Sequence, residues 1–337
     1  MGTKNLKIKV VFLCRKPLKM GNFSIETYFK LVRENLNDPF VPVYREMPFL
    51  NNGFFKRLGN AIYCLFNQAD INHITGDIHY VAAFLRKKKT TLTVHDCGIM
   101  HQVTGLKYKV FKWLWYTIPN NHTIKFTAVS QATKEDVIKF TDCNESKVKV
   151  IYVSINAAFT KQPKTFNARE PRILQLGTAF NKNIERLVQA LKDIPCKLVI
   201  VGKVQDNIIA SLNNNGINYE IIDRRLTDEE IIVEYHKCDI LSFISTLEGF
   251  GIPIVEANAV GRVVITGNVT SMPEVADNAA HLVDPFSVDE MKKGFIKIIN
   301  DEEYRNKLIE NGYSNCKRFS IETITAEYMS LYSEIAG

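Results

Sequence analysis

The chain has 337 residues, of which 46% are apolar and 23% charged, a composition that excludes an intrinsically disordered chain and is typical of a soluble globular protein. This length predicts two domains of ordinary size, each long enough to bury its own core. The formal net charge of +7 favours anionic partners such as phosphates, acidic lipids or nucleic acid, without choosing among them.

The N-terminal apolar run Lys7–Cys14 is too short for the hydrophobic region of a secretory signal and predicts a first buried strand. No apolar run approaches the ~18 residues that a membrane span needs. The seven cysteines stand far apart and form no C-x-x-C pair, which indicates reduced, buried thiols in a reducing compartment. The sequence therefore predicts a cytoplasmic protein that is either soluble or peripheral at the inner face of the plasma membrane.

Short runs rich in Val, Ile and Phe alternate with segments of helical period along the first half of the chain. The predicted strands are 7–13, 41–45, 71–74, 90–95, 124–129 and 147–153. The predicted helices are 24–36, 54–67, 78–86, 105–118 and 131–140. Alternation at this spacing predicts a parallel sheet covered by helices on both faces.

Residues 156–171 are polar, hold two prolines and show no period, so they predict a linker between domains. The alternation then restarts. The predicted strands are 172–176, 197–201, 219–222, 239–244, 263–266 and 280–283, and the predicted helices are 182–192, 205–214, 227–236, 253–260, 287–299 and 302–313. The sequence thus predicts an α/β protein with two doubly wound domains. Open parallel sheets bind ligands at the carboxyl ends of their strands, so the expected site is a cleft between these domains.

Loops after the strands of the first half carry several candidate residues. Gly21 follows the first strand, in a stretch without the G-x-G-x-x-G fingerprint, and the alternative interpretation is a plain turn. His95 follows strand 90–94; with Cys97 and His101 it could suggest a metal, but the spacing matches no standard zinc pattern and a fourth ligand is missing. Ser130 precedes helix 131–140, where its simplest role is that of an N-cap.

The segment 105–118 interleaves lysines with aromatic residues. Drawn as a helix, it has one stripe of Leu106, Val110, Trp113 and Leu114, a second of Tyr108, Phe111, Trp115 and Ile118, and a remaining strip with Lys109 and Lys112. A helix this widely apolar is most often buried in a core. The alternative interpretation, supported by the basic run 86–89, is a face for a membrane surface or a lipid acceptor.

In the second half, a strand ends at Leu176-Gly177-Thr178 and a helix is predicted to begin near Lys182. An ammonium group at such a turn would meet an anion as a point charge. Taken alone, however, Lys182 would be interpreted as a solvated surface lysine.

The string EGFGIPIVE occupies 248–256, between a predicted strand and a short helix. Pro253 fits the first helical position, and the free N–H groups and positive dipole end of the helix favour a phosphate there. Glu248 and Glu256 would repel that phosphate, so they are expected to accept hydrogen bonds from sugar or ribose hydroxyls instead. The string therefore predicts a ligand with both phosphate and polyol. The alternative is an ordinary helix start with acidic residues.

The stretch STLEGFGIPIVEANAVGRVVITGNVTSMPEVADNAAHLVDP resembles the donor-binding region of the family 4 retaining glycosyltransferases, whose hallmark is E-x7-E inside an E-G-F-G-x-P-x-x-E-A string. The end of the chain, KRFSIETITAEYMSLYSEI, resembles the closing helix of that family. The resemblance implies the GT-B fold, with two Rossmann-like domains facing a central cleft. It implies an acceptor-side domain at 1–160, a nucleotide-sugar donor domain at 161–320, and a helix at 321–337 that crosses back to the first domain.

The resemblance also implies roles for individual residues. Glu256 would bind ribose, Glu248 would contact the donor sugar, Lys182 would lie on the donor phosphates, and His95 would touch the sugar at the reaction centre. The implied donor site comprises Gly21, Gly177, Thr178, Lys182, Glu248, Gly249, Phe250, Gly251, Ile252 and Glu256, with Glu248, His95 and Lys182 as catalytic residues and Ser130, Asn183 and Arg224 lining the cleft. Two positions depart from the family pattern: Thr178 stands where an Arg is common, and Gly21-Asn22 stands where a double glycine is usual. The phosphate contact that such an Arg would make could come instead from Arg186, Arg224 or Arg225.

The implied activity is transfer of a hexosyl group from a nucleotide diphosphate sugar to a hydroxyl of a glycan or lipid-linked glycan in surface polysaccharide synthesis. The implied mechanism is a front-face substitution that needs neither an enzyme nucleophile nor a metal, and no nucleic acid partner is expected. Contact with an anionic membrane is expected for a lipid-linked acceptor. Two alternatives remain open: a sugar-nucleotide epimerase of the same architecture, and a non-catalytic protein that binds nucleotide sugars.

Overall fold

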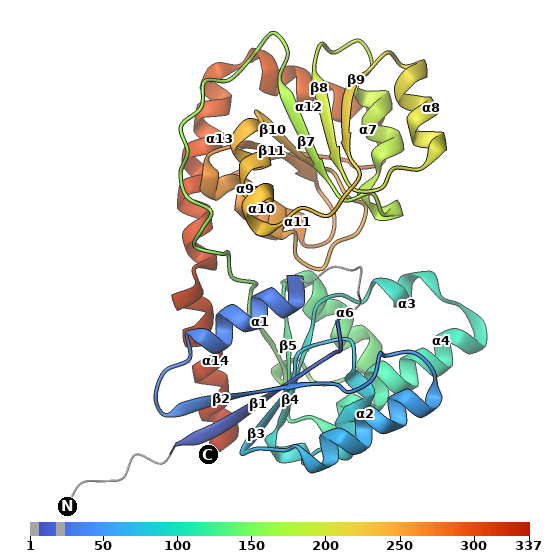
Figure 1. Ribbon diagram of the computed structural model, residues 1–337, viewed down its shortest axis with the longest axis vertical. Coiled ribbons are helices and arrows are strands. Elements are labelled where there is room, and N and C mark those ends of the chain that lie inside the picture. Colours follow the sequence, from blue (N-terminus) through green and yellow to red (C-terminus); the bar gives the residue numbers. More distant parts are fainter. Residues whose placement is uncertain (1–6, 18–23) are drawn as a thin grey trace, which may run out of the picture. The chain divides into compact units, whose positions relative to one another are not determined.

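The computed structural model describes residues 7–17 and 24–337, and the chain divides into two compact units (Figure 1). The first unit combines the chain up to Ser154 with Ile321–Gly337, and the second is Ile155–Ser320. The predicted site residue Gly21 lies outside the described residues. None of the helices in the described part of the chain is both long and apolar enough to cross a membrane.

The first unit is built on a parallel six-stranded sheet with the strand order β2-β1-β3-β4-β5-β6. Its strands are β1 (Ile8–Cys14), β2 (Phe40–Glu46), β3 (Ile71–Ile74), β4 (Thr90–Val94), β5 (Lys125–Ala128) and β6 (Val148–Val150). Every strand predicted in this half is confirmed to within a few residues at its ends. The central strands β3 and β4 are buried along their whole length, although their sequences INHI and TTLTV include polar residues, namely Asn72, His73, Thr90, Thr91 and Thr93.

Helices cover both faces of this sheet (Figure 1). They are α1 (Ser24–Glu34), α2 (Phe54–Phe66), α3 (Gly98–Gln102), α4 (Gly105–Lys112), α5 (Ile118–His122), α6 (Gln131–Thr141) and α14 (Ile321–Ala336). The core on one face is shared by α1 and α14. The core on the other face is shared by α2, α6 and the turns at 79–84 and 113–117.

The predicted α-helix at 78–86 is wrong, because His79–Phe84 forms a 3₁₀ helix. The four consecutive residues His79–Ala82 are all buried, a pattern that has no helical period. The conformation of this segment is therefore determined by packing on every side and not by local helical propensity.

The predicted helix 105–118 is not one uniform helix. It begins as α4, passes through a π turn at Trp113–Thr117 and continues as α5, whose second residue is Pro119. Proline has no N–H to donate to the carbonyl of Trp115 four residues earlier. The ring Nδ1 of His79 donates to that carbonyl instead, at 2.9 Å. A buried histidine of a neighbouring turn thus donates to the carbonyl that Pro119 cannot reach with an N–H.

The two apolar stripes suggested by the sequence of this segment differ in burial. Trp115 is buried and stacks on Phe111, with ring centroids 4.5 Å apart, so this stripe belongs to the core. Leu106, Val110 and Trp113 of the other stripe are exposed. The core interpretation therefore holds for one stripe and, in the other, only for Leu114, which packs against the same core.

The final helix α14 is fixed to the first unit by a buried polar network. His73 lies between Tyr332 and Thr93, with 2.7 Å from Nδ1 to the phenol oxygen and 2.7 Å from Nε2 to the hydroxyl oxygen. The hydroxyls of Tyr28 and Tyr328 lie 3.0 Å apart. Burial lowers the pKa of His73 to about 3, so the ring is neutral and each nitrogen has a partner.

The second unit is a parallel six-stranded sheet with the order β12-β11-β10-β7-β8-β9. Its strands are β7 (Arg172–Leu176), β8 (Lys197–Val201), β9 (Asn218–Ile222), β10 (Ile240–Phe243), β11 (Val263–Gly267) and β12 (His281–Val283). Its helices are α7 (Ile184–Leu191), α8 (Asp206–Asn214), α9 (Asp228–Lys237), α10 (Ile252–Val260), α11 (Met272–Ala276), α12 (Val288–Asn300) and α13 (Glu302–Asn315). The predicted strands and helices of this half are confirmed, and the five-residue helix α11 is an addition to them.

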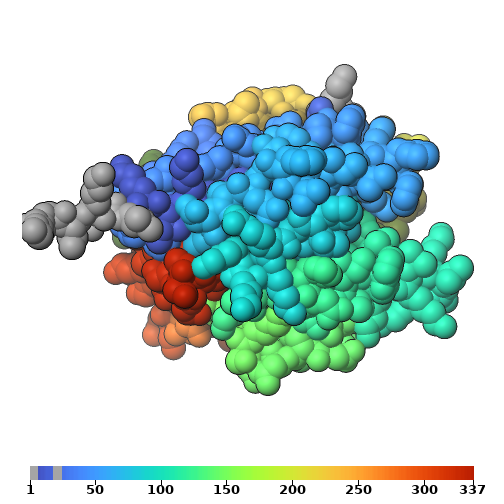
Figure 2. Space-filling view, turned by 90° about the horizontal axis from the view of Figure 1, so that it is seen from below, coloured from blue at the N-terminus to red at the C-terminus, as the bar shows by residue number. Residues whose placement is uncertain are grey.

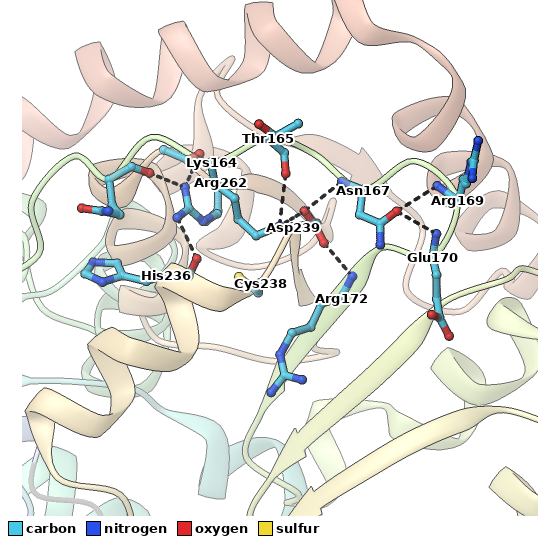
Figure 3. Close-up of polar contacts among 12 residues, drawn as sticks. Lys164, Thr165, Asn167, Arg169, Glu170, Arg172, His236, Cys238, Asp239 and Arg262 are labelled. Atoms are coloured by element: carbon cyan, nitrogen blue, oxygen red, sulfur yellow. Dashed lines mark hydrogen bonds and ion pairs between the residues drawn. The ribbon is translucent and has the colours of Figure 1, made fainter.

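The segment 156–171, predicted to be a linker, has neither helix nor strand but is held firmly against the second unit (Figure 3). The buried carboxylate of Asp239 pairs with the ammonium of Lys164 and accepts from the backbone N–H groups of Asn167 and Arg172, at 3.2 and 2.8 Å. The buried guanidinium of Arg262 donates to the carbonyl of Gln162 at 2.8 Å. These contacts mean that the segment is not a free tether.

Candidate functional site

The loops that follow β7 and β10 meet in the second unit, because these strands are parallel neighbours in the sheet. The backbone N–H of Thr246 donates to the carbonyl of Asn181 at 2.8 Å, and the side-chain amide of Asn181 donates to the carbonyl of Leu247 at 2.8 Å. The loop after β7 contains Gly177 and a 3₁₀ turn at Phe180–Lys182, and the loop after β10 contains Glu248. Two segments about seventy residues apart in sequence thus form one surface.

Lys182 and Glu248 form an ion pair on this surface, with 2.6 Å between Nζ and Oε1. Their side chains are only 18% and 15% exposed. The ammonium also lies 4.6 Å from the centroid of the Phe243 ring, and Asn181 donates to the same carboxylate oxygen at 3.2 Å. The sequence predicted separate ligand contacts for these two residues, and the structure brings them into direct contact. An incoming anion would therefore compete with Glu248 for the ammonium of Lys182.

Gly177 gives Lys182 the room to reach across the turn. Its φ of +78° lies in the left-handed region, and a Cβ built on it would lie 3.3 Å from the Cε atom of Lys182. A side chain at this position would be strained and would push against the lysine stem. Thr178, the next residue, lies against Gly202, the residue that follows β8.

The turn from Glu248 to Gly251 leads directly into α10. Gly251 has a φ of +106° and caps the helix, which begins at Ile252 with Pro253 in its first turn. In this first turn Pro253 has no N–H and the N–H of Ile254 donates to the carbonyl of Gly251 at 3.0 Å, which leaves the N–H groups of Gly251 and Ile252 at this end of the helix. Between Glu248 and this helix, Gly249 is followed by Phe250, whose buried ring packs edge-on against Phe319.

Ser271 holds this turn through its side-chain hydroxyl, a role that the sequence analysis missed. Its buried hydroxyl lies 3.0 Å from the carbonyl oxygen of Glu248 and 2.8 Å from that of Phe250. The hydroxyl of Thr270 accepts from the backbone N–H of Glu248 at 3.3 Å. The serine opens the string SMPEV at 271–275, and its hydrogen bonds hold the glycine-rich turn in shape.

Glu256 lies in the second turn of α10 and accepts a hydrogen bond from Tyr235, with 2.7 Å between Oε2 and the phenol oxygen. Loss of hydration raises the pKa of the Glu256 carboxyl to about 7; the hydrogen bond from Tyr235 opposes this rise, and the negative charge of Asp228 adds to it. Tyr235 is fully buried on α9, and no sequence signal pointed to it. It fixes one carboxylate oxygen and leaves the other to accept further hydrogen bonds.

The remaining predicted residues of the second unit have structural partners. Asn183 is buried, and its amide donates to the carbonyls of Ile244 and Pro285, at 3.2 and 2.6 Å. Its carbonyl oxygen accepts from Arg186 at 2.9 Å. Arg224 is exposed and makes two hydrogen bonds to Glu230, at 2.7 and 2.9 Å. The structure thus places Asn183 as a brace between loops and Arg224 at the start of α9.

His95 occupies the carboxyl end of β4 in the first unit. Its Nε2–H donates to the carbonyl of Thr75 at 2.7 Å, and burial lowers the pKa of the ring. The ring is therefore neutral, with Nδ1 left as an acceptor. Gly76 has a φ of +138°, and a Cβ there would lie 2.8 Å from the ring carbon Cδ2. The chain needs a glycine at this position for His95 to lie where it does.

An ionic cluster that the sequence analysis missed flanks this histidine. Arg15, just after β1, pairs with Glu26 at 2.7 Å and with Asp77, the residue after Gly76. The cluster joins the loops after β1 and β3 to helix α1 and so fixes the backbone beside His95.

Ser130 and Asp96 have local roles in the first unit. Ser130 is buried, and its hydroxyl accepts from the backbone N–H of Thr133 at 3.0 Å, which makes it the N-cap of α6. Asp96 accepts from the N–H of Gly98 at 2.8 Å and orients the turn after β4. His101 pairs with Asp136 at 2.8 Å. In the described ranges 7–17 and 24–337, no three His, Cys, Asp or Glu side chains gather as a metal ion would require.

Two protein-family models match the chain. The family described as Glycosyltransferase Family 4 matches residues 8–159, and the family described as Glycosyl transferases group 1 matches residues 156–315. Together they cover both halves of the chain.

Curated relatives of the chain are also described as glycosyltransferases or mannosyltransferases. The serotype-specific mannosyltransferase WbdA of Escherichia coli is 26% identical over 220 residues, covering 57% of this chain and 26% of the relative. The O-antigen chain mannosyltransferase B of Escherichia coli is 30% identical over 170 residues, covering 47% of this chain and 45% of the relative. The uncharacterized glycosyltransferase MJ1178 of Methanocaldococcus jannaschii is 28% identical over 269 residues, covering 76% and 72%. The match thus spans about a quarter of WbdA's length.

Solved structures share the fold across nearly the whole chain. Alr3699/HepE of Anabaena, in complex with UDP and glucose, has a TM-score of 0.79 at 15% identity and covers 97% of this chain and 100% of its own. WaaG, a glycosyltransferase involved in lipopolysaccharide biosynthesis, has a TM-score of 0.69 at 14% identity and covers 96% and 99%. The predicted fold class, GT-B with two doubly wound parallel sheets, is confirmed.

Proposed function

Because the chain belongs to family 4 of the glycosyltransferases, we propose that it moves a hexosyl group from a nucleotide diphosphate sugar to a hydroxyl acceptor, with the anomeric configuration retained. The observation that carries this proposal is the meeting of Lys182 and Glu248 beside the N-terminus of α10, with Glu256 in the next turn. A cation, a helix N-terminus and two carboxylates at one place fit a ligand that has both phosphate and hydroxyl groups.

In the proposed reaction the protein positions the donor and stabilises the charge that develops on the leaving group. The N–H groups at the start of α10 and the ammonium of Lys182 bind the diphosphate. Glu248 then accepts hydrogen bonds from the sugar, and Glu256 from the ribose. The bond from the anomeric carbon to the phosphate oxygen breaks as the acceptor oxygen bonds on the same face. The acceptor proton passes to the leaving diphosphate.

A donor panel tests this proposal against its two alternatives. We expect one or more nucleotide diphosphate sugars to release nucleoside diphosphate in the presence of a glycan acceptor, and proton NMR to show a product with the donor's anomeric configuration. Conversion of the free sugar nucleotide without any acceptor would instead identify an epimerase. Binding without turnover across the panel, in the presence of glycan acceptors, would favour a non-catalytic protein.

We expect transfer to survive EDTA, because Lys182 and the first N–H groups of α10 can carry the charge of the leaving diphosphate. The measurement compares initial rates in the presence and in the absence of an excess of the chelator. A rate that vanishes with EDTA and returns with magnesium or manganese would contradict this expectation.

The pKa of Glu256 predicts how nucleoside binding depends on pH. Since the carboxyl has a raised pKa of about 7, it is ionised above that pH and protonated below it. A protonated carboxyl accepts fewer hydrogen bonds from a ribose diol, so we expect the affinity for an uncharged nucleoside to fall as the pH falls through 7. Calorimetry at several pH values measures this fall.

The variant Glu256→Gln is the control for this measurement. Because an amide does not titrate, the affinity of this variant for the nucleoside should not change with pH. In Tyr235→Phe the carboxylate of Glu256 loses a hydrogen-bond donor, which raises its pKa further. The affinity for the nucleoside should therefore begin to fall at a higher pH than in the unaltered protein. An unaltered protein whose affinity is the same above and below pH 7 would show that Glu256 does not bind ribose.

For the acceptor, we propose a glycan or lipid-linked glycan of surface polysaccharide, presented at the inner face of the plasma membrane to a cytoplasmic, peripherally bound enzyme. The names of the mannosyltransferase relatives support a glycan acceptor. The lysine-rich helix α4 supports membrane contact, since Leu106 and Val110 are exposed on it and Trp113 is exposed directly after it. The basic run 86–89 supports it less, because Arg86 donates to the carbonyl of Ala69 and Lys89 to the carbonyls of Ile335 and Ala336.

A further inference from the structure

We propose that α2 is a membrane-inserting helix, and that its exposed apolar face docks the first unit onto a lipid surface that carries anionic headgroups. This inference concerns an element to which the sequence analysis assigned no function. It goes beyond the proposed transfer reaction and does not depend on that reaction, since it follows from the surface of the first unit alone.

The outward face of α2 is apolar, which is the reverse of the usual arrangement in a surface helix. Six large apolar side chains of this thirteen-residue helix are exposed: Phe54 (73%), Phe55 (84%), Leu58, Ile62, Leu65 and Phe66 (80%). At 3.6 residues per turn, all six fall within about 120° of the helix circumference. The opposite side, with Asn60, Ala61 and Cys64, is buried against the sheet.

Neighbouring elements extend this apolar face. The half-exposed ring of Phe49 lies against Gly59 of α2, where an added Cβ would meet the ring at 2.8 Å. The exposed residues Leu106 and Val110 of α4, together with Trp113 at the start of the π turn, form a second stripe of the same kind. Arg57 of α2 contacts the π turn that follows α4, since its guanidinium lies 4.9 Å from the centroid of the Trp115 ring. Figure 2 shows α2, in blue, and α4, in teal, both at the surface of the first unit.

Charge identifies the occupant of this face as anionic lipid. Helices α2 and α4 hold five basic residues and no acidic one; the basic residues are Lys56, Arg57, Lys107, Lys109 and Lys112. Lys112 is paired with Asp142 at 3.4 Å, so the other four carry the argument. Lys107 and Lys109 lie on either side of the exposed α4 stripe. Rings and aliphatic chains that enter the acyl boundary, with lysines beside them at the headgroups, are the arrangement of an interfacial helix.

A second copy of the chain fits this face less well. Two such faces pressed together would bring the basic residues of both copies close to one another, and neither helix offers a carboxylate to pair with them. An anionic bilayer accepts both the apolar side chains and the cations.

Vesicle flotation with the full chain, without donor or acceptor, tests the proposal. We expect the unaltered protein to float with phosphatidylcholine vesicles that contain phosphatidylglycerol. The triple variant F54S/F55S/F66S should lose at least tenfold in vesicle affinity. The control is Phe286→Ser, which removes a ring that is 57% exposed in the second unit and should float like the unaltered protein. Since the altered residues are exposed, the triple variant should melt as a folded protein, and circular dichroism checks this.

Insertion depth gives a second readout that does not rely on the triple variant. A tryptophan introduced as Phe55→Trp, with Trp113→Phe to reduce background, should be quenched by brominated acyl chains and should shift its emission to shorter wavelength. Failure of the unaltered protein to float, equal flotation of the triple variant, or no quenching at position 55 would each overturn the proposal. So would a vesicle-independent dimer that the triple variant abolishes. None of these outcomes would bear on the transfer reaction, because no substrate is present.

Discussion

Replacing Glu248 with alanine is expected to lower the rate of glycosyl transfer by about a hundredfold or more while leaving the fold intact. A carboxylate that holds the sugar hydroxyls fixes the reacting carbon relative to the acceptor, and misplacement by about 1 Å costs on the order of 10² in rate. The variant also releases Lys182 and Asn181 from the oxygen to which both are bonded. The loss should therefore appear in kcat as well as in KM.

Initial rates with the best donor of the panel measure this effect, and thermal melting checks the fold. Glu248 belongs to no apolar core cluster of the second unit, so the melting temperature should change little. Glu248→Gln keeps the shape but accepts with one oxygen only, and should retain an intermediate rate. The matched control is Glu310→Ala, an exposed carboxylate on α13. Near-normal turnover of Glu248→Ala would show that this residue does not contact the donor.

Replacing Lys182 with alanine is expected to weaken the binding of a nucleoside diphosphate by roughly ten- to a hundredfold, while the binding of the nucleoside changes little. Removing a charge-assisted hydrogen bond costs about 1.5–3 kcal/mol. The structure adds a second reason, since the variant leaves the carboxylate of Glu248 without its cation beside the bound phosphates. Removing both side chains should then recover part of the affinity that Lys182→Ala loses.

Calorimetry with the nucleoside and its diphosphate measures this difference. Lys192→Ala, at the end of α7, removes an equal charge from the same unit away from the ion pair and should bind both ligands normally. If Lys182→Ala weakened the binding of the nucleoside and of its diphosphate equally, this lysine would not bind the phosphates. Further weakening in the double variant would show that Glu248 supports the diphosphate instead of competing with it.

Much of the fold could be predicted because its strands are parallel and central. Such strands are buried on both faces, so runs such as 198–201 are continuously apolar and stand out between helices of clear period. The turn at Glu248 could be predicted for a different reason. Its two glycines, its proline and its helix start all lie within nine consecutive residues, so the geometry is encoded locally.

The contacts that complete the site could not be predicted, because each joins distant parts of the chain. Nothing near Glu256 in sequence indicates the phenol of Tyr235 as its partner, and nothing near Glu248 indicates Lys182. The exposed face of α2 escaped prediction because its large apolar residues lie on one side of the helix, and such a side is usually the one that faces the core. In α2 this side is turned outward instead. At the break between α4 and α5, the hydrogen bond to Trp115 comes from His79, a residue of another turn.

The packing of α14 into the first unit has a consequence for the synthesis of the chain. Tyr328 and Tyr332 complete a core that begins with Phe12 and Phe29, yet the ribosome adds them after the whole of Ile155–Ser320. At ~5–20 residues per second, the core residues of β1 and α1 wait on the order of ten seconds or longer for the helix that covers them. During translation the second unit is therefore free to fold first, while the earlier-made half keeps an open apolar face that chaperones can bind.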